Sequence, residues 1–285
     1  LVCNGVDTCQ NGRCSKHLDD RCPTIAGCVT MVSGKIEGET WTSAGSPYCV
    51  DGNILVKGSG LVIEPGVRVE FRGEHVFEVQ GTVKAVGTEA APIVFTKGAG
   101  LSGTVGKGVF FNNAPAGSVL KHCRFEYLND GGMRIVNSFP TIENSKITNN
   151  AATGNGGGIR VLLDGSPGEL LIKNSHIDGN VATGNGGGVY AELSTGSLTL
   201  EDCTVNNNRA NSAWAATSYY GGGIYVLASG GLSLKRSEIR GNSTYSYCNG
   251  DYCGSYGYGG GLFIGEGTVN VENSAVASNR ADAGC

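Results

Sequence analysis

The acidic and basic side chains of this chain do not form the groupings that catalysis requires. A glycosidase needs two carboxylates at a set separation. A polysaccharide lyase needs a base beside a Ca²⁺ site or an equivalent cation. Asp19 and Asp20 lie in a cysteine-rich stretch, and Asp164, Asp178 and Asp202 do not recur at one repeat position. The histidines also fall at unrelated places: His17, His75, His122 and His176. These residues favour a protein that is not an enzyme.

Two glycine-rich strings could suggest a bound ion. Thr-Gly-Asn-Gly-Gly-Gly occurs at 153–158 and again at 183–188. Glycine-rich calcium repeats use an Asp that these strings lack, and a phosphate-binding loop would be followed by a Lys. We therefore expect no cofactor and no metal.

Aromatic side chains gather in two segments, 209–220 and 243–258. Exposed Tyr and Trp provide rigid, amphipathic contact area, which suits recognition of a glycan or a protein. The alternative is that the rings pack on one another and close the two loops, and both can hold together. The predicted ligand-binding residues are Trp214, Tyr219, Tyr220, Tyr245, Tyr247, Tyr252, Tyr256 and Tyr258.

The eleven cysteines fall into several groups. Six lie close to the N-terminus, where three disulfides could hold a segment too short to bury a core. A zinc site is the alternative to disulfides for these cysteines, but no Cys-x-x-Cys pair supports it. Cys248 and Cys253 flank a turn-forming tetrapeptide and are expected to pair with each other. The six N-terminal residues are Cys3, Cys9, Cys14, Cys22, Cys28 and Cys49.

A repeated string must position all these residues. It reads apolar-x-polar-small-x-apolar-x-x-Asn and occurs at 142–150, 172–180, 200–208, 234–242 and 271–279. Four copies are followed by a Gly-Gly-Gly-apolar signature, beginning at Gly156, Gly186, Gly221 and Gly259. A period of this length is typical of a stacked repeat fold. Segments 209–220 and 243–258 are insertions between string and signature, so they should emerge from one side and touch.

Each repeat unit is expected to hold two short strands, one in the string and one after the glycines. Both alternate with period 2, and glycine triplets exclude helix. Short alternating stretches in the first half predict less regular coils of the same kind. The chain is therefore predicted to be all-β, a parallel β-helix of about ten coils. Residues 1–28 would form a cysteine-rich N-terminal segment and residues 29–285 the β-helix.

Stacking predicts which residues line up in columns. One column holds the small position, namely Cys123, Ser145, Ser175, Cys203, Ser237 and Ser274. A second holds the string's final Asn, whose amide can bond the same Asn one coil on and which tolerates a left-handed corner. A third column alternates in sign: Glu143, Lys173, Glu201, Lys235 and Glu272.

The first column makes a prediction about thiols. Three coils separate Cys123 from Cys203, roughly 14 Å at the spacing of neighbouring strands. A disulfide needs Cα atoms closer than about 7 Å. Both are therefore expected to be free, buried thiols. Cys285 then has no partner except the 248–253 loop or a continuation, which suggests a piece of a longer chain.

The glycine signatures and the Ile147-x-x-Asn150, Ile177-x-x-Asn180 and Val205-x-x-Asn208 motifs resemble the polymorphic outer-membrane-protein repeats of adhesin-like β-helix passenger domains. That family more often has Phe where this chain has Ile or Val. The resemblance covers roughly residues 131–279. It implies a right-handed solenoid in a secreted or cell-surface setting, exposed at an outer membrane, often serving adhesion.

Charge and hydropathy argue against a nucleic-acid-binding protein and against a membrane-spanning segment. The net charge is −4, with only 16% charged residues, so a nucleic-acid partner is not expected. No apolar run is long enough for a membrane span. The sequence thus predicts a scaffold for adhesion or recognition of a glycan or surface protein. The alternative is a carbohydrate-active β-helix enzyme, a lyase or a hydrolase.

Overall fold

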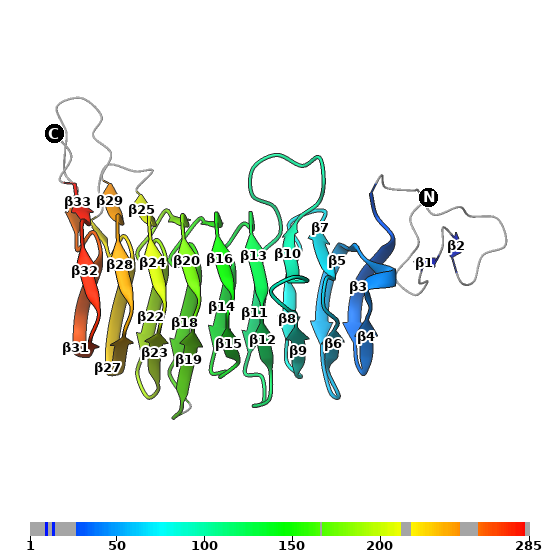
Figure 1. Cartoon of the computed structure of the whole chain (residues 1–285), viewed down its shortest axis with the longest axis horizontal. Helices are drawn as coiled ribbons and strands as arrows, with labels where there is room; N and C mark the ends of the chain where they lie inside the picture. The colour runs from blue at the N-terminus through cyan, green and yellow to red at the C-terminus, as the bar shows by residue number, and fades with distance from the viewer. Residues whose placement is uncertain are drawn as a thin grey trace.

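The computed structural model describes residues 27–165, 167–211, 218–245 and 256–282, together with the backbone of 9–10 and 13–14. The chain winds into a rod of stacked coils, with its first and last described coils at opposite ends (Figure 1). Within these residues the only helix is the short 3-10 turn η1(Ser43–Gly45). Every strand pairing in the rod is parallel, whereas β1(Cys9–Gln10) and β2(Arg13–Cys14) pair antiparallel. The parallel β-helix expected from the repeat is confirmed.

The rod has three long faces, each a ladder of parallel strands. β3, β5, β27 and β31 turn a corner and serve two faces each. The first face consists of β3(Thr30–Ile36), β5(Tyr48–Val56), β7(Arg68–Phe71), β10(Ile93–Lys97), β13(Cys123–Glu126), β16(Lys146–Thr148), β20(His176–Asp178), β24(Thr204–Asn206), β28(Glu238–Arg240) and β32(Ala275–Ala277). The second face consists of β3, β5, β8(Phe77–Val79), β11(Val109–Asn112), β14(Met133–Val136), β18(Ile159–Leu163), β22(Val189–Leu193), β27(Ile224–Lys235) and β31(Leu262–Glu272). The third face consists of β4(Glu39–Trp41), β6(Leu61–Ile63), β9(Val83–Val86), β12(Val119–Lys121), β15(Thr141–Glu143), β19(Glu169–Lys173), β23(Ser197–Glu201), β27 and β31.

Two smaller ladders lie between the first and second faces along the chain. They also pair in parallel, and they carry the start and end of the inserted segments. One is β17(Ala151–Ala152), β21(Val181–Ala182), β25(Arg209–Asn211), β29(Ser243–Tyr245) and β33(Arg280–Ala281). The other is β26(Tyr219–Tyr220) with β30(Gly257–Tyr258).

The repeat unit has more strands than the sequence indicated. The string that was expected to form one strand is divided, so that 142–147 spans the end of β15 and the start of β16 on two different faces. The division falls at Asn144, whose φ of 49° is left-handed. A compact residue, Ser145, follows it and lies fully inside. The two-strand unit was wrong because period-2 alternation does not reveal a corner between two three-residue strands.

The final Asn of each string forms a continuous interior column. The backbone N–H and the side-chain Nδ2 of Asn150 both donate to Oδ1 of Asn180, each at 3.0 Å. Asn150 Nδ2 also donates to the carbonyl of Phe125 at 2.9 Å. The same three bonds recur up the column through Asn208, Asn242 and Asn279. The left-handed corner expected at these asparagines is instead one residue earlier, for example at Asn149 and Asn207.

The small-residue column is confirmed as a second polar ladder. The backbone N–H of Ser145 donates to Ser175 Oγ at 3.1 Å, and Ser145 Oγ donates to the carbonyl of Glu143 at 2.7 Å. Cys123 and Cys203 occupy the same column, and their backbone N–H groups donate to Ser145 and Ser237 Oγ, each at 3.1 Å. Both cysteines are free, buried thiols.

Glycine is required in the triplets by close approach of neighbouring coils. A Cβ on Gly157 would lie 2.5 Å from the carbonyl oxygen of Gly187, and one on Gly187 would lie 2.4 Å from that of Gly222. Contacts this short are excluded for real side chains. The triplets therefore mark where the backbone of each coil packs against the next, at the entry to the second face.

Candidate functional site

The two long insertions meet, as their position in the repeat predicted. β26 pairs with β30 in parallel, which places Tyr220 opposite Tyr258. Their rings stack at 5.2 Å between centroids with planes 12° apart. Tyr256 lies against Tyr258 at 6.3 Å. The described parts of the insertions therefore form one surface.

The predicted ligand-binding residues differ in exposure. Tyr245, Tyr256 and Tyr258 are 41%, 52% and 44% exposed, whereas Tyr219 is buried at 7% and Tyr220 is half-buried. Trp214, Tyr247 and Tyr252 lie outside the described residues. Both readings of the insertions thus have support: the rings pack on each other, and three of them still present area to solvent.

The structure adds a column of rings that the sequence analysis missed. Tyr190, Tyr225 and Phe263 stack on successive rungs of the second face, at 5.0 Å and 5.5 Å, with planes within 6°. Tyr220 contacts Phe263 at 4.4 Å and Tyr225 at 6.2 Å, which joins this column to the insertions. The signal was present, because all three follow directly after a Gly-Gly-Gly-apolar signature. We call Tyr220, Tyr225, Tyr245, Tyr256, Tyr258 and Phe263 the aromatic patch.

The column is anchored by a buried ring. The hydroxyl of Tyr190 donates a hydrogen bond to the carboxylate of Glu192 on the same strand. Burial, together with the Glu192 carboxylate, raises the pKa of Tyr190 above that of an ordinary phenol. The phenol therefore stays neutral at physiological pH and keeps its hydrogen bond. Arg209 adds a cation at the edge of the patch, with its guanidinium 4.5 Å from the Tyr245 ring centre.

The same outward column continues below Tyr190 with two arginines. Arg160 and Arg134 occupy the next two rungs, and Phe110 the rung after them. The Arg134 guanidinium lies 3.7 Å from the centre of the Phe110 ring, and that of Arg160 lies 5.8 Å from the Tyr190 ring. Six successive rungs thus carry planar side chains at one position of the second face.

The sign-alternating column is confirmed on the third face. The register places Lys121, Glu143, Lys173, Glu201, Lys235 and Glu272 on successive rungs. Lys173 pairs with Glu201 at 2.8 Å. Arg236 adds ion pairs to Glu201 at 2.7 Å and to Asp202 at 2.8 Å, and these cations lower the pKa of both carboxyls. Lys173 and Arg236 thus form a local ion-pair network with the two carboxylates, as is ordinary for a solvated charge column.

One hydrogen-bonded group of titratable residues lies on the first face. His176 Nδ1 is 2.8 Å from Thr204 Oγ1, which is 3.2 Å from Asp178 Oδ1. The backbone N–H of Asn206 donates to the same oxygen at 2.9 Å. Partial burial raises the pKa of Asp178, and the Asn206 bond and the charge of His176 oppose this. His176 is exposed, as expected for an outward residue.

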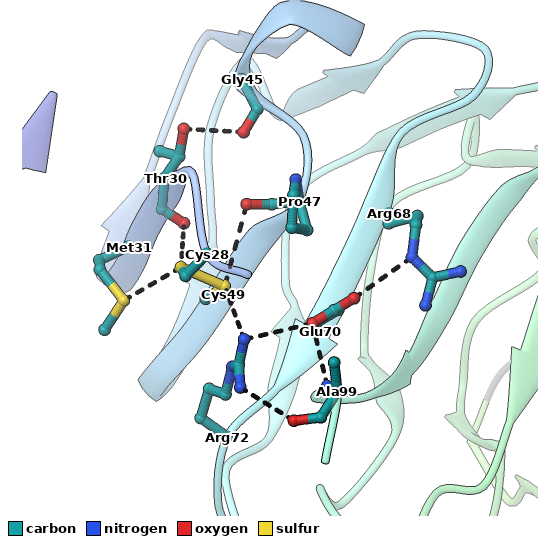
Figure 2. Close-up of a disulfide and its surroundings, with 10 residues drawn as sticks. All are labelled: Cys28, Thr30, Met31, Gly45, Pro47, Cys49, Arg68, Glu70, Arg72 and Ala99. Atoms are coloured by element: carbon teal, nitrogen blue, oxygen red, sulfur yellow. Dashed lines mark hydrogen bonds and ion pairs between the residues drawn. A yellow bond between two sulfur atoms is a disulfide. The ribbon is translucent and has the colours of Figure 1, made fainter. Parts of the chain in front are cut away.

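A disulfide between Cys28 and Cys49 joins the predicted N-terminal segment to the first coils, with Cα atoms 6.0 Å apart (Figure 2). Beside it, the buried carboxylate of Glu70 pairs with Arg68 at 3.2 Å and with Arg72 at 3.4 Å. Glu70 also accepts the backbone N–H of Ala99, and Arg72 donates to the carbonyl of Ala99. This corner thereby holds the start of the loop between β10 and β11.

The other predicted disulfide cysteines lie outside the described side chains. The backbone register of β1 and β2 places Cys9 opposite Cys14. Cys3, Cys22, Cys248, Cys253 and Cys285 are not among the described residues.

Neither a metal site nor a membrane helix is found in the part of the chain that the structure describes. No three His, Cys, Asp or Glu side chains there come close enough to hold an ion. None of the described helices has the length and apolar character to cross a membrane.

Comparison with known proteins identifies the family. The family described as "right handed beta helix region" matches residues 96–284, which is more than half of the chain. No curated protein is significantly similar to the chain, and no solved structure is either. The match fixes the hand of the solenoid and includes the second-face columns and both insertions. The chain belongs to the right-handed β-helix family.

Proposed function

We propose that this β-helix is a recognition scaffold of a secreted or cell-surface protein, which binds a glycan or a surface protein through the aromatic patch. The observation that carries the proposal is the exposure of Tyr245, Tyr256 and Tyr258 beside an ordered stack of rings. Solvent-exposed aromatic area costs hydration free energy, and on a monomer its concentration in one place is a feature of interaction sites. The Cys28–Cys49 disulfide supports an oxidising compartment.

Rigidity favours binding over simple loop closure. Tyr220 packs against Tyr225 and Phe263 of the second-face column and stacks on Tyr258. Tyr225 itself stacks between Tyr190 and Phe263. A ligand that contacts rings already held in place loses less conformational entropy on binding than one that must order them. The stacking therefore closes the loops and also prepares their outer surface for contact.

A double substitution tests the patch. Tyr256→Ala with Tyr258→Ala removes the two most exposed rings, and Tyr127→Ala removes a 40% exposed tyrosine elsewhere as a matched control. Binding to immobilised glycans and to surface proteins would be measured by interferometry. We expect the double variant to lose about tenfold or more in affinity, as for typical aromatic contacts, and the control to bind as the wild type. Equal binding by all three proteins would contradict the proposal.

A carbohydrate-active enzyme is the second candidate, favoured by the His176–Thr204–Asp178 group. With Asp178 ionised, Thr204 donates its hydroxyl proton to the carboxylate and accepts from His176 Nδ1–H. His176 is exposed, so a substrate can reach its imidazole. Lys146 lies on the adjacent rung, where it can neutralise an acid group of a substrate.

Incubation with acidic and neutral polysaccharides, with and without Ca²⁺, tests this candidate. An unsaturated product with new ultraviolet absorbance, lost in His176→Gln but retained in Tyr127→Ala, would establish a lyase. New reducing ends without that absorbance would indicate a hydrolase. Unchanged polysaccharides would remove the enzyme and leave recognition as the function.

A further inference from the structure

The disulfide between Cys28 and Cys49 has one cysteine close to solvent and one inside the fold. Cys28 is half-buried and lies between two exposed residues, whereas Cys49 has none of its surface exposed. A thiolate opens a disulfide by attacking one of its two sulfurs, and access decides which one is attacked. Cys28 is therefore the sulfur that an external thiol can reach, and Cys49 is the sulfur that would leave.

The two sulfurs also differ in the charge beside them. Cys49 Sγ lies 3.7 Å from Nη2 of Arg72. Cys28 Sγ instead lies 3.3 Å from the thioether sulfur of Met31 and 3.6 Å from the carbonyl oxygen of Thr30 (Figure 2). A cation beside a thiolate lowers its pKa, and a thiol of lower pKa leaves faster. Arg72 is thus placed to stabilise the sulfur that burial already selects as the leaving group.

Burial on its own would disfavour a thiolate at Cys49. At Cys123, which is also buried, burial raises the pKa of the thiol to about 12. Cys49 has the guanidinium of Arg72 in addition. The Arg72 side chain is itself only 8% exposed, and solvent ions screen a charge interaction at such a depth less than they do at the surface. The local cation therefore opposes the cost of burying the departing charge.

Two further contacts hold Arg72 against the disulfide. Its Nη2 pairs with the buried carboxylate of Glu70 at 3.4 Å, and its Nη1 donates to the carbonyl of Ala99 at 3.4 Å. Glu70 also pairs with Arg68 at 3.2 Å. Because two arginines share this carboxylate, Glu70 keeps a cation beside it when Arg72 turns toward a newly charged sulfur. The corner can therefore accommodate the charge of a departing thiolate.

The first coil has backbone pairing of its own beside the disulfide. β3 pairs with β5 from Thr30 onward. The backbone N–H groups of Val29 and Thr30 both donate to the carbonyl of Pro47, at 3.3 Å and 3.2 Å. These bonds begin at the residue that directly follows Cys28. Opening the disulfide therefore removes the covalent link between the N-terminal segment and the rod while the rung stays paired.

We propose that Cys28 is a thiol-exchange site, where a small external thiol forms a mixed disulfide while Arg72 stabilises the departing Cys49 thiolate. The attacking thiol first loses its proton to solvent. Its sulfur then bonds to Cys28 Sγ, the bond between Cys28 and Cys49 breaks, and the electron pair of that bond goes to Cys49. One disulfide is consumed and one is formed, so the step needs no other oxidant or reductant. The product is a folded rod that carries the small thiol on Cys28.

Peptide mapping tests which sulfur is attacked. The folded wild-type protein is incubated with glutathione, the exchange is stopped with acid at early times, and free thiols are blocked with N-ethylmaleimide in urea. Mass spectrometry of the digest is expected to find glutathione on Cys28 and the maleimide on Cys49. Glutathione on Cys49, equal amounts on both cysteines, or a disulfide that opens only in unfolded protein would overturn the inference.

Variants test the role of the cation. Arg72→Gln should slow the exchange about tenfold because Cys49 becomes a poorer leaving group, and Arg72→Lys, which keeps the charge, should recover much of the rate. Arg68→Gln is the matched control, since Arg68 pairs with the same Glu70 carboxylate and is more exposed, at 46%, to an approaching thiolate. It should change the rate by less than about twofold. Equal slowing by the two glutamine variants, or an unchanged rate in Arg72→Gln, would overturn the inference.

Circular dichroism separates exchange from unfolding. Cys28→Ser with Cys49→Ser lacks the bond from the start and should keep the β-sheet spectrum of the wild type, because the pairing from Thr30 onward remains. Loss of structure in this variant would show that the rod needs the bond, and would overturn exchange in the folded protein. If Arg72→Gln does not fold, the peptide mapping still decides the inference, because it uses the wild type.

Discussion

The first coils and the repeated coils build the same rod with opposite placements of their aromatic residues. In the first coils the rings are inside: Trp41, Phe77, Phe95 and Phe125 contact one another in sequence, at 5.9, 5.7 and 4.9 Å. In the repeated coils the interior is aliphatic, as at Ile147, Ile177 and Val205, and the rings of Tyr225 and Phe263 stack outside. One backbone architecture thus accepts two kinds of interior.

The difference follows from how each region fills the corners of a coil. In the irregular first coils, bulky aromatic side chains fill the interior through apolar packing. The repeated coils instead place compact Ser and Asn side chains inside, where each bonds the next coil. A polar column of this kind requires a compact residue at every rung, Asn in one column and Ser or Cys in the other, which favours a regular repeat. It also leaves the outward positions free to carry aromatic side chains for contact.

Removing one asparagine should give the largest effect. Asn180→Ala deletes the acceptor of two Asn150 donors and the donor to Ile147 and Asn208, leaving buried groups unpaired on both neighbouring coils. We expect a loss of about 5 kcal/mol in unfolding free energy. Urea denaturation followed by circular dichroism measures it, with Thr148→Ala as the control on a neighbouring outward position. A loss below about 1 kcal/mol would show that the ladder does not stabilise the repeats.

Truncating an interior ring should cost nearly as much. Phe95 is fully buried between Phe77 and Phe125. Phe95→Ala should lower the unfolding free energy by about 4 kcal/mol, through lost apolar burial and the cavity left behind. Val62→Ala, at an exposed position of the third face, should change it by less than about 0.5 kcal/mol. If Phe95→Ala proved nearly neutral, the first coils could not be said to depend on their rings.

Cys123 and Cys203 lie in the small-residue column, which runs through both regions, and their reactivity tests whether this column is buried in each. Burial raises the pKa of Cys123 to about 12 and of Cys203 to about 11, so little thiolate exists at pH 8. Iodoacetamide should label both only after unfolding. Cys123→Ser and Cys203→Ser should each change stability by less than about 1 kcal/mol, since the hydroxyl can donate to the carbonyls that the sulfurs already face. Rapid labelling of the folded protein would show that the column is open to solvent.

The charge cluster on the third face should give the smallest effect. Arg236 lowers the pKa of Asp202, and Lys173 together with Arg236 lowers that of Glu201, so the folded state binds protons more weakly than the unfolded state. The resulting stability is present above the ordinary carboxyl pKa and is lost as the pH falls through the lowered values. Arg236→Gln should therefore lower stability slightly at pH 7 and leave it unchanged near pH 2, whereas Lys84→Gln should show no such trend. Melting temperatures of the wild type and of Arg236→Gln between pH 2 and pH 7 measure this difference in stability. A difference that did not change with pH would contradict the prediction.

Much of the architecture could be predicted because the repeat is local in sequence. The columns of Ser145, Asn150 and Glu143 follow directly from aligning the strings, and the register confirms each. The left-handed backbone of Asn144 could not be predicted, because it depends on the turn between two faces. The candidate site was found only in part. The insertions were visible as added length. The supporting column of Tyr190, Tyr225 and Phe263 was overlooked, although each ring directly follows a Gly-Gly-Gly-apolar signature.

By itself, the sequence determined the rung: which residues repeat, which are compact, and where glycine lets one coil pack on the next. These follow from short-range geometry, since a period-2 strand and a glycine triplet permit few conformations. Only the tertiary structure decided what the rungs create together. Arg134 and Arg160 are 26 residues apart in the chain and become neighbours because stacking places them there. A surface that spans several coils is therefore a property of the stack and of no single repeat.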